Sequence, residues 1–192
     1  MPRSVYTTPV ISPVLRTLAR FGLWITGWKI EEGPPESIHK CMVIGGPHTS
    51  NWDYVLFLVC ILVLRMDVKV MVKDNIYRWP IRWLCRWAGV IPVNRRQSNT
   101  VVRQMSRLFE QHDDLMIIIT PEGTRSKVAR WKTGFYHIAK SADVPVLLAY
   151  LDYSRKRAGF GPCVHLSDDM DADIAEMQAF YAPITPRHPH LR

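Results

Sequence analysis

Residues 41–53 read Cys-Met-Val-Ile-Gly-Gly-Pro-His-Thr-Ser-Asn-Trp-Asp, and this stretch decides the fold. Its apolar first part, Cys41 to Ile44, ends in two glycines and predicts a buried strand. The apolar run that follows, Tyr54 to Leu64, is too long for one strand and predicts a helix. His48 therefore lies at a strand-to-helix junction, where α/β proteins place their functional groups.

His48 and Asp53 are the candidate catalytic residues of this junction. Ser50 or Asn51 can cap the predicted helix, and Asp53 lies in its first turn, where a carboxylate is favoured. Because His48 precedes the helix, Asp53 can reach back to one ring nitrogen and leave the other free to act as a base. The alternative interpretation is a capping aspartate beside an unrelated loop histidine.

Composition indicates a globular chain in a reducing compartment. With 192 residues, the chain is long enough for one domain with a real core. The four cysteines are scattered and show neither metal-knuckle nor redox-pair spacing, which predicts buried thiols. The first residues lack a secretory signal pattern, and no apolar run reaches the length of a membrane span. We therefore expect a cytoplasmic protein.

The positive charge is concentrated in one segment. Ten basic and two acidic residues lie between Arg65 and Arg107, an excess equal to the net charge of +8 of the whole chain. This segment is expected to face something anionic.

From Lys40 onward, predicted strands and helices alternate, which indicates βαβ crossovers. The predicted strands are Cys41–Gly45, Val68–Val72, Val90–Val93, Leu115–Thr120, Val146–Leu151 and a short one near Cys163–Leu166. The predicted helices are Asn51–Leu64, Ile76–Ala88, Asn99–His112, Arg130–Ala142 and Asp171–Tyr181. The expected fold is a single α/β domain, 1–192, whose mostly parallel central sheet is flanked by helices. An N-terminal helix and loop occupy 1–40, the core 41–183, and a mobile tail 184–192.

Two helices carry both basic residues and tryptophans. Pro13 to Lys29 is predicted as an amphipathic helix, with Trp24 and Trp28 near its end. The helix after Asn75 places a row of arginines beside a row of tryptophans, namely Arg78, Arg82 and Arg86 next to Trp79, Trp83 and Trp87. Such helices suit an anionic membrane surface. Single-stranded nucleic acid and packing against the domain itself are the alternatives.

Two further turns follow predicted strands. Arg95 comes two residues after the strand Val90–Val93, at the carboxyl end that forms the site edge of an open sheet. Pro121-Glu122-Gly123-Thr124-Arg125 follows Leu115–Thr120 in the same way. Its glycine permits a tight turn whose amides can point at an anion, and the planar guanidinium of Arg125 suits phosphate.

Taken in order, these blocks resemble the glycerolipid acyltransferase family, whose best-known members are the 1-acylglycerol-3-phosphate acyltransferases. The blocks are His-x4-Asp at His48–Asp53, Gly-x5-Arg at Gly89–Arg95, Pro-Glu-Gly-Thr-Arg at Pro121–Arg125, and an apolar strand with proline at Val144–Val146. The resemblance covers about residues 40 to 150. The chain departs from the common pattern at Pro47, where many members have asparagine, and at Ala149, where a second proline is common.

The resemblance implies transfer of an acyl group from a thioester of coenzyme A or acyl carrier protein to a hydroxyl of a lysophospholipid-type acceptor. His48 would act as general base and Asp53 would orient it. The candidate substrate-binding residues are Arg95, Thr124 and Arg125 for an acceptor phosphate, Gly123 for the oxyanion through its amide, and Glu122 to orient an arginine or the acceptor. No cofactor is implied beyond the acyl donor. The expected location is cytoplasmic, peripherally associated with the membrane.

Two rival functions compete with this interpretation. A zinc hydrolase is disfavoured because the histidines lack paired ligand spacing, so no metal is expected. A basic, aromatic-rich module that binds nucleic acid or membrane without catalysis would explain the charge. It would leave the His48/Asp53 and Glu122/Arg125 junctions unexplained, and we expect no nucleic-acid partner.

Overall fold

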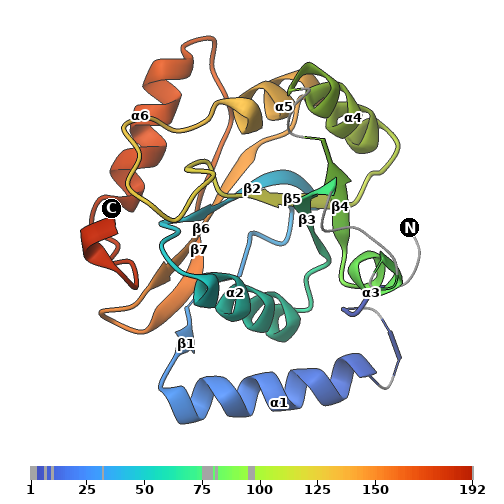
Figure 1. Cartoon of the computed structure of the whole chain (residues 1–192), viewed down its shortest axis with the longest axis vertical. Helices are drawn as coiled ribbons and strands as arrows, with labels where there is room; N and C mark the ends of the chain where they lie inside the picture. The colour runs from blue at the N-terminus through green and yellow to red at the C-terminus, as the bar shows by residue number, and fades with distance from the viewer. Residues whose placement is uncertain are drawn as a thin grey trace.

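A central sheet organises the computed structural model, which describes the chain except residues 1–3, 7, 10, 32, 75–79, 81, 95–97 and 192 and the side chains of residues 73, 98 and 99. Within the described residues, seven strands form one sheet in the order β1-β7-β6-β2-β5-β3-β4 (Figure 1). The strands are β1 (Lys29–Ile30), β2 (Lys40–Gly46), β3 (Val68–Lys73), β4 (Val90–Val93), β5 (Leu115–Ile119), β6 (Val146–Asp152) and β7 (Arg157–Val164).

Five consecutive strands of the sheet confirm the predicted parallel arrangement. Strands β6, β2, β5, β3 and β4 pair in parallel, and β2 lies between β6 and β5. Strand β7 differs from the prediction, because it begins at Arg157 and runs antiparallel to β6. Two glycines and a proline within β7 hide the strand pattern, since these residues are depleted in strands. Strand β1, which was not predicted, pairs with β7.

Helices cover both faces of the sheet, as predicted. The helices are α1 (Ile11–Thr26), α2 (Asn51–Leu64), α3 (Arg82–Trp87), α4 (Ser98–Glu110), α5 (Gly134–Ala142) and α6 (Met170–Tyr181), followed by a short 3-10 turn, Pro189–Leu191. Helices α1, α2 and α3 lie on one side of the sheet and α4, α5 and α6 on the other (Figure 1). A core cluster built around Phe109 and Phe135 fills the second side. Clusters around Ile61 and Cys60 fill the first, which is the side that carries the site.

Helix α1 turns an apolar stripe outward. Its inner side chains, among them Ala19 and Leu23, are buried and face α2. Its outer apolar side chains are exposed by 43% to 75%: Ile11, Val14, Leu18, Phe21, Trp24 and Ile25. Trp28 corrects the prediction that paired it with Trp24, because it is buried and packs on Tyr153. Gly27, with φ of 74°, ends the helix and turns Trp28 inward.

The predicted arginine and tryptophan rows are described only in part, since Arg78 and Trp79 lie outside the described residues. Trp83 is 70% exposed, whereas Trp87 is half-buried and its Nε1–H donates to Thr8 Oγ1 at 2.9 Å. Arg82 and Arg86 are exposed. The rows therefore do not behave as one surface, because Trp87 holds the N-terminal segment while Trp83 faces solvent.

The final residues pack against the domain, which corrects the prediction of a mobile tail. Ile184 is 3% exposed. The backbone N–H of Tyr153 donates to the carbonyl of Thr185 at 2.9 Å. The backbone N–H of His188 donates to Thr49 Oγ1 at 3.1 Å. A buried apolar anchor and paired backbone groups thus hold the C-terminal segment, residues 184–191, beside the His48 junction.

Candidate active site

The site lies at the carboxyl end of β2, in the middle of the sheet. Strand β2 ends at Gly46, a cis peptide joins Gly46 to Pro47, and His48 follows before α2 begins. The turn after β5 reaches the same edge, because the backbone N–H of His48 donates to Glu122 Oε1 at 3.3 Å. Parallel neighbouring strands therefore bring together residues that are 74 positions apart in the sequence.

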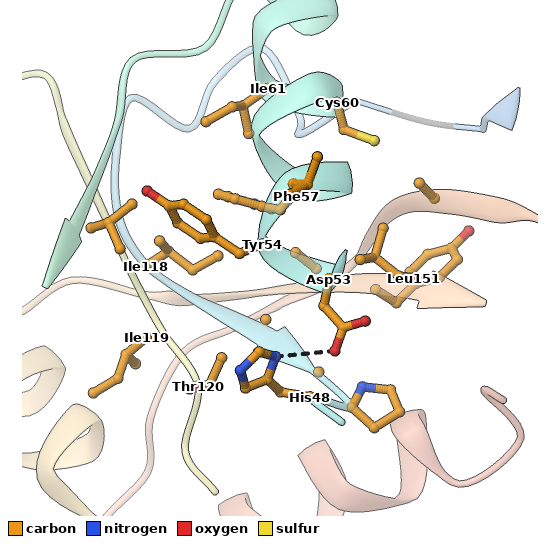
Figure 2. A pocket seen from close by; sticks show the side chains of 18 of the residues that line it. His48, Asp53, Tyr54, Phe57, Cys60, Ile61, Ile118, Ile119, Thr120 and Leu151 are labelled. Carbon is orange, nitrogen blue, oxygen red and sulfur yellow. Dashed lines mark hydrogen bonds and ion pairs between the residues drawn. The ribbon is translucent and has the colours of Figure 1, made fainter. Parts of the chain in front are cut away.

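Asp53 is fully engaged by donors. Its Oδ2 lies 3.1 Å from His48 Nδ1 and accepts the backbone N–H groups of Thr49 and Ser50 at 2.8 and 2.9 Å (Figure 2). Its Oδ1 accepts the hydroxyl of Tyr153 at 2.7 Å. The same carboxylate completes a capping box with Ser50, whose Oγ accepts the N–H of Trp52 at 3.2 Å. Helix capping and histidine orientation are therefore two effects of one side chain.

The electrostatics favour an ionised Asp53. Burial alone would raise its pKa, but the hydrogen bonds from His48, Tyr153 and the two backbone amides outweigh burial and hold the pKa below its ordinary value. The pKa of Tyr153 is raised by burial and by Asp53, so its hydroxyl remains a donor. With Nδ1 facing a carboxylate, the Nε2 nitrogen of His48 is left for a reacting group.

Glu122 differs from Asp53 in having a free oxygen. Its Oε1 accepts the His48 N–H, while no described residue donates to its buried Oε2. Burial raises the pKa of the Glu122 carboxyl, and the contact with His48 only partly offsets this. Such a group is costly to keep charged unless a ligand pairs with it.

Arg125 lies beside the first residue of α2 and, like His48, lines the large cavity described below. Its Nη1 donates to Asn51 Oδ1 at 2.7 Å, and its side chain is exposed. Arg125 thus contacts Asn51, whereas Glu122, which was predicted to orient an arginine or the acceptor, contacts the His48 backbone. Thr124 is also exposed and accepts the N–H of Ser126 at 3.3 Å. Arg95, the other arginine predicted for the acceptor, lies outside the described residues.

The amide of Gly123 is not available for the oxyanion role predicted for it. Its N–H donates to the carbonyl of Thr120 at 3.1 Å, which closes the turn. Gly123 has φ of 63°, and a Cβ there would lie 2.7 Å from Lys132 Nζ. The positive φ of the turn thus favours glycine at this position, and the Lys132 side chain occupies the space beside it.

A long apolar cavity of about 740 Å³ opens at His48. Figure 2 shows side chains of α2 along its length, from Asp53 past Tyr54 and Phe57 to Ile61. Residues of β5, among them Ile118, close one side and residues of β6 the other. His48, Asn51 and Arg125 supply the polar end of an otherwise mainly apolar space.

A second, smaller cavity of about 220 Å³ lies on another side of His48. Its polar lining includes Glu122, Ser126, Lys127 and Gln178. Leu191 of the C-terminal segment closes part of it. His48 lines both cavities. A polar group bound in the smaller cavity and an apolar hydrocarbon chain bound in the larger one can therefore both lie next to His48.

The sequence singled out most of these residues but missed three. Tyr153, Asn51 and the C-terminal segment all contact the site. Tyr153 directly follows β6, whose carboxyl end lies at the same edge as that of β2. The strand order would have pointed to Tyr153, but strand order cannot be read from local patterns. Among the described residues there is no cluster of three histidine, cysteine or acidic side chains suited to a metal.

Comparisons with known proteins point to one family. The family model described as Acyltransferase matches residues 30–150. The chain is 31% identical over 131 residues to the 1-acyl-sn-glycerol-3-phosphate acyltransferase of Haemophilus influenzae, with 63% of this chain and 52% of that protein covered. The chain thus spans about half the length of this curated relative. The crystal structure of the 1-acyl-sn-glycerophosphate (LPA) acyltransferase PlsC from Thermotoga maritima matches with a TM-score of 0.58 and 14% identity, over 88% of this chain and 76% of that one.

Proposed function

We propose, since the chain belongs to the Acyltransferase family, that it transfers a fatty acyl group from a thioester to a hydroxyl of a lysophospholipid-type acceptor such as 1-acylglycerol 3-phosphate. The donor is acyl-coenzyme A or an acyl carrier protein. The observation that carries this proposal is the His48–Asp53 pair at the mouth of the long apolar cavity. A base with an orienting carboxylate suits hydroxyl activation, and an apolar cavity suits an acyl chain.

The reaction follows from this geometry. The acceptor hydroxyl gives its proton to Nε2 of His48 while its oxygen forms a bond to the thioester carbonyl carbon. Asp53 stabilises the resulting imidazolium through Nδ1, as the carboxylate does in serine hydrolase triads. The tetrahedral intermediate then collapses, the carbon–sulfur bond breaks, and the imidazolium returns the proton to the departing thiolate. No covalent acyl-enzyme is needed.

Arg125 is the proposed ligand of the acceptor's anionic group. Its guanidinium is exposed at the polar end of the cavity and is held there by Asn51. A guanidinium meets phosphate with two parallel hydrogen bonds. Glu122, whose Oε2 has no donor among the described residues, is proposed to accept a hydroxyl of the acceptor in the smaller cavity. Arg95 and Thr124 stay as further candidates for the anion.

The direct test is an acyl-transfer assay with the purified full chain. Lysophosphatidic acid is incubated with acyl-coenzyme A or with acyl carrier protein, and phosphatidic acid is measured by mass spectrometry. The wild type is expected to form phosphatidic acid with at least one of the two donors, and the His48→Ala variant is expected to form none. A folded wild type that forms no diacyl product with either donor across several lysophospholipid acceptors would contradict the proposal.

The role of Arg125 is tested by steady-state kinetics. Arg125→Ala is expected to raise the acceptor KM by more than tenfold, since losing a charge-assisted bidentate pair costs about 2–4 kcal/mol, and to leave the donor KM nearly unchanged. Arg125→Lys should rescue only part of the loss, because a point charge lacks the fork. The matched control is Arg130→Ala, another exposed arginine, five positions further along the chain. Normal acceptor kinetics in a folded Arg125→Ala variant would remove it from the acceptor site.

We also propose that the protein binds an anionic membrane surface through α1 and α3. The outward stripe of α1 exposes six large apolar side chains, with Trp24 the most exposed at 75%. Helix α3 adds exposed Trp83 next to Arg82 and Arg86. Apolar side chains with tryptophan and arginine suit the lipid interface. Of the described helices, none has the length and apolar character that a membrane span requires.

Liposome sedimentation tests this surface. Phe21→Ser with Trp24→Ser, and separately Arg82→Gln with Arg86→Gln, are expected to release the protein from vesicles that contain anionic lipid. Each basic residue near such a surface contributes about 1 kcal/mol, screened by salt. Arg103→Gln with Arg107→Gln on α4 removes the same charge from the other side of the sheet and serves as the control. Equal binding by all variants would show that α1 and α3 serve another purpose.

A further inference from the structure

Tyr153 contacts the His48–Asp53 pair through Asp53 and from outside the two cavities. Its hydroxyl donates to Asp53 Oδ1 at 2.7 Å, whereas His48 and the two backbone amides use Oδ2. Tyr153 lines neither the large nor the small cavity. We propose that Tyr153 is a positioning residue that orients the Asp53 carboxylate and sets how strongly Asp53 holds a protonated His48. This inference rests on the proposed function of His48 as a base.

Three elements hold Tyr153 in place. It directly follows β6, which pairs with β2, so its backbone is part of the same sheet edge. Trp28, two residues after the end of α1, packs edge-on against its ring with 5.0 Å between the centroids. Its backbone N–H donates to the Thr185 carbonyl of the C-terminal segment. With its backbone held at two points and its ring packed by Trp28, Tyr153 can hold a carboxylate to one orientation.

Several charged and titratable groups surround Tyr153 and Asp53 and influence proton binding at His48. His48 contacts Asp53 directly, and Glu122 lies near enough to both for charge interaction. Arg187, from the C-terminal segment, interacts with Tyr153, and its guanidinium lies 5.5 Å from the centre of the Trp52 ring. Tyr153 is the described donor to Oδ1 of Asp53, while the donors to Oδ2 are His48 and the two backbone amides.

The proposal predicts a direction for proton uptake. A hydroxyl that donates to Oδ1 stabilises the carboxylate and draws its charge away from Oδ2. Tyr153→Phe removes this donor, so Asp53 faces His48 with more charge and stabilises the imidazolium more strongly. The His48 ring signal in NMR should therefore change with pH at a higher pH in the variant than in the wild type. The acidic limb of kcat/KM should move in the same direction.

Kinetics separate positioning from substrate binding. Tyr153→Phe is expected to lower kcat by about tenfold, the lower end of what lost supporting contacts cost at metal sites. Both KM values should stay within about twofold of the wild type, because Tyr153 lines neither cavity. Replacing Tyr153 by 3-fluorotyrosine, a stronger donor of nearly the same size, should shift the His48 titration to lower pH. The fluorinated variant keeps the test open if the phenylalanine variant folds poorly.

Tyr136→Phe is the matched control. The Tyr136 hydroxyl donates to another buried carboxylate, Asp173 Oδ2, at 2.9 Å on the far side of the sheet. Its removal should lower stability while leaving the His48 titration and the pH profile of kcat/KM unchanged. A shift in this control equal to that of Tyr153→Phe would mean a general effect of lost stability, and would overturn the proposal.

The NMR titration of His48 tests the role of Tyr153 independently of whether the protein transfers acyl groups. An unchanged or lowered His48 titration in folded Tyr153→Phe would overturn the role of Tyr153, whatever the turnover. A wild type without acyl transfer would instead contradict the proposed function, and the NMR titration would still report on the contact between Tyr153 and Asp53.

Discussion

Two buried aspartates, Asp53 and Asp173, lie in the first turns of helices on opposite sides of the sheet and have similar hydrogen-bond partners. Asp53 is 6% exposed in the first turn of α2, and Asp173 is 7% exposed in the first turn of α6. Each accepts a tyrosine hydroxyl, from Tyr153 at 2.7 Å and from Tyr136 at 2.9 Å. From the residues before its helix, Asp53 accepts two backbone N–H groups and Asp173 accepts one.

The difference between the two lies in what else reaches the carboxylate. Asp53 holds a histidine that opens onto two cavities, whereas Asp173 holds the hydroxyl of Ser167 at 2.9 Å. A buried carboxylate with amide and tyrosine donors can therefore tie the first turn of a helix to the loop before it, and it does not by itself mark a catalytic site. The histidine and the cavity make the Asp53 junction a candidate for chemistry.

The largest expected contrast is in activity. His48→Ala should abolish acyl transfer without unfolding the protein, because the base is lost while little core volume is. Asp53→Asn should reduce kcat severely, by about 10⁴ if it behaves like the carboxylate of a serine hydrolase triad. Asp173→Asn should leave turnover within about twofold. Near wild-type turnover in a folded His48→Ala variant would show that His48 is not the base.

Stability should distinguish the two aspartates less than activity does. Either Asp→Asn change leaves a buried donor poorly paired and should cost about 1–3 kcal/mol in urea unfolding at pH 7. For Asp53 the cost should shrink in acid. Its pKa is lowered in the folded state, so its contribution is present above the unfolded value of about 3.9 and is lost as pH falls through the folded value. An Asp53→Asn cost that does not change with pH would contradict this linkage.

The sequence predicted what depends on neighbouring residues. The bounds of α2, Asn51–Leu64, were predicted correctly, because Ser50, Asp53 and the apolar run are all local signals. His48 and Asp53 contact each other as predicted, and the capping interpretation that competed with it also holds. The central strands were found for the same reason, since each is a short apolar run between turn residues.

What the sequence missed depends on contacts between distant segments. Tyr153 reaches Asp53 across 100 positions, and only the order of strands β6 and β2 brings them together. The C-terminal segment was predicted to be mobile because its prolines and histidines form no periodic apolar pattern. It nevertheless contacts the site through backbone groups. The sequence placed Trp28 on the same interfacial helix as Trp24, but the positive φ of Gly27 ends the helix and directs Trp28 into the core.

Glu122 gives a third carboxyl against which to test the comparison, since its Oε2 has no donor among the described residues. Its pKa is raised by burial, so the folded chain keeps this proton above the unfolded value of about 4.3. The wild type should therefore lose stability relative to Glu122→Gln as pH rises through the folded pKa, by at most about 1–3 kcal/mol. Urea midpoints of both proteins between pH 4 and 8 measure this gap. A gap that stays constant would mean that Glu122 is solvated or paired.

The smallest effect concerns the link between Asp53 and the C-terminal segment, which Asp173 lacks. Thr49 donates its N–H to Asp53, and its buried Oγ1 accepts the His188 N–H at 3.1 Å. Thr49→Val keeps the shape and removes this acceptor, so it should cost about 0.5–1.5 kcal/mol. Because the His188 N–H then loses its hydrogen-bond acceptor, trypsin should cleave after Arg187 faster than in the wild type. Ser167→Ala removes a hydroxyl beside Asp173 and serves as the control. If both variants are cleaved after Arg187 at the wild-type rate, Ile184 and the Thr185 carbonyl hold the segment without Thr49.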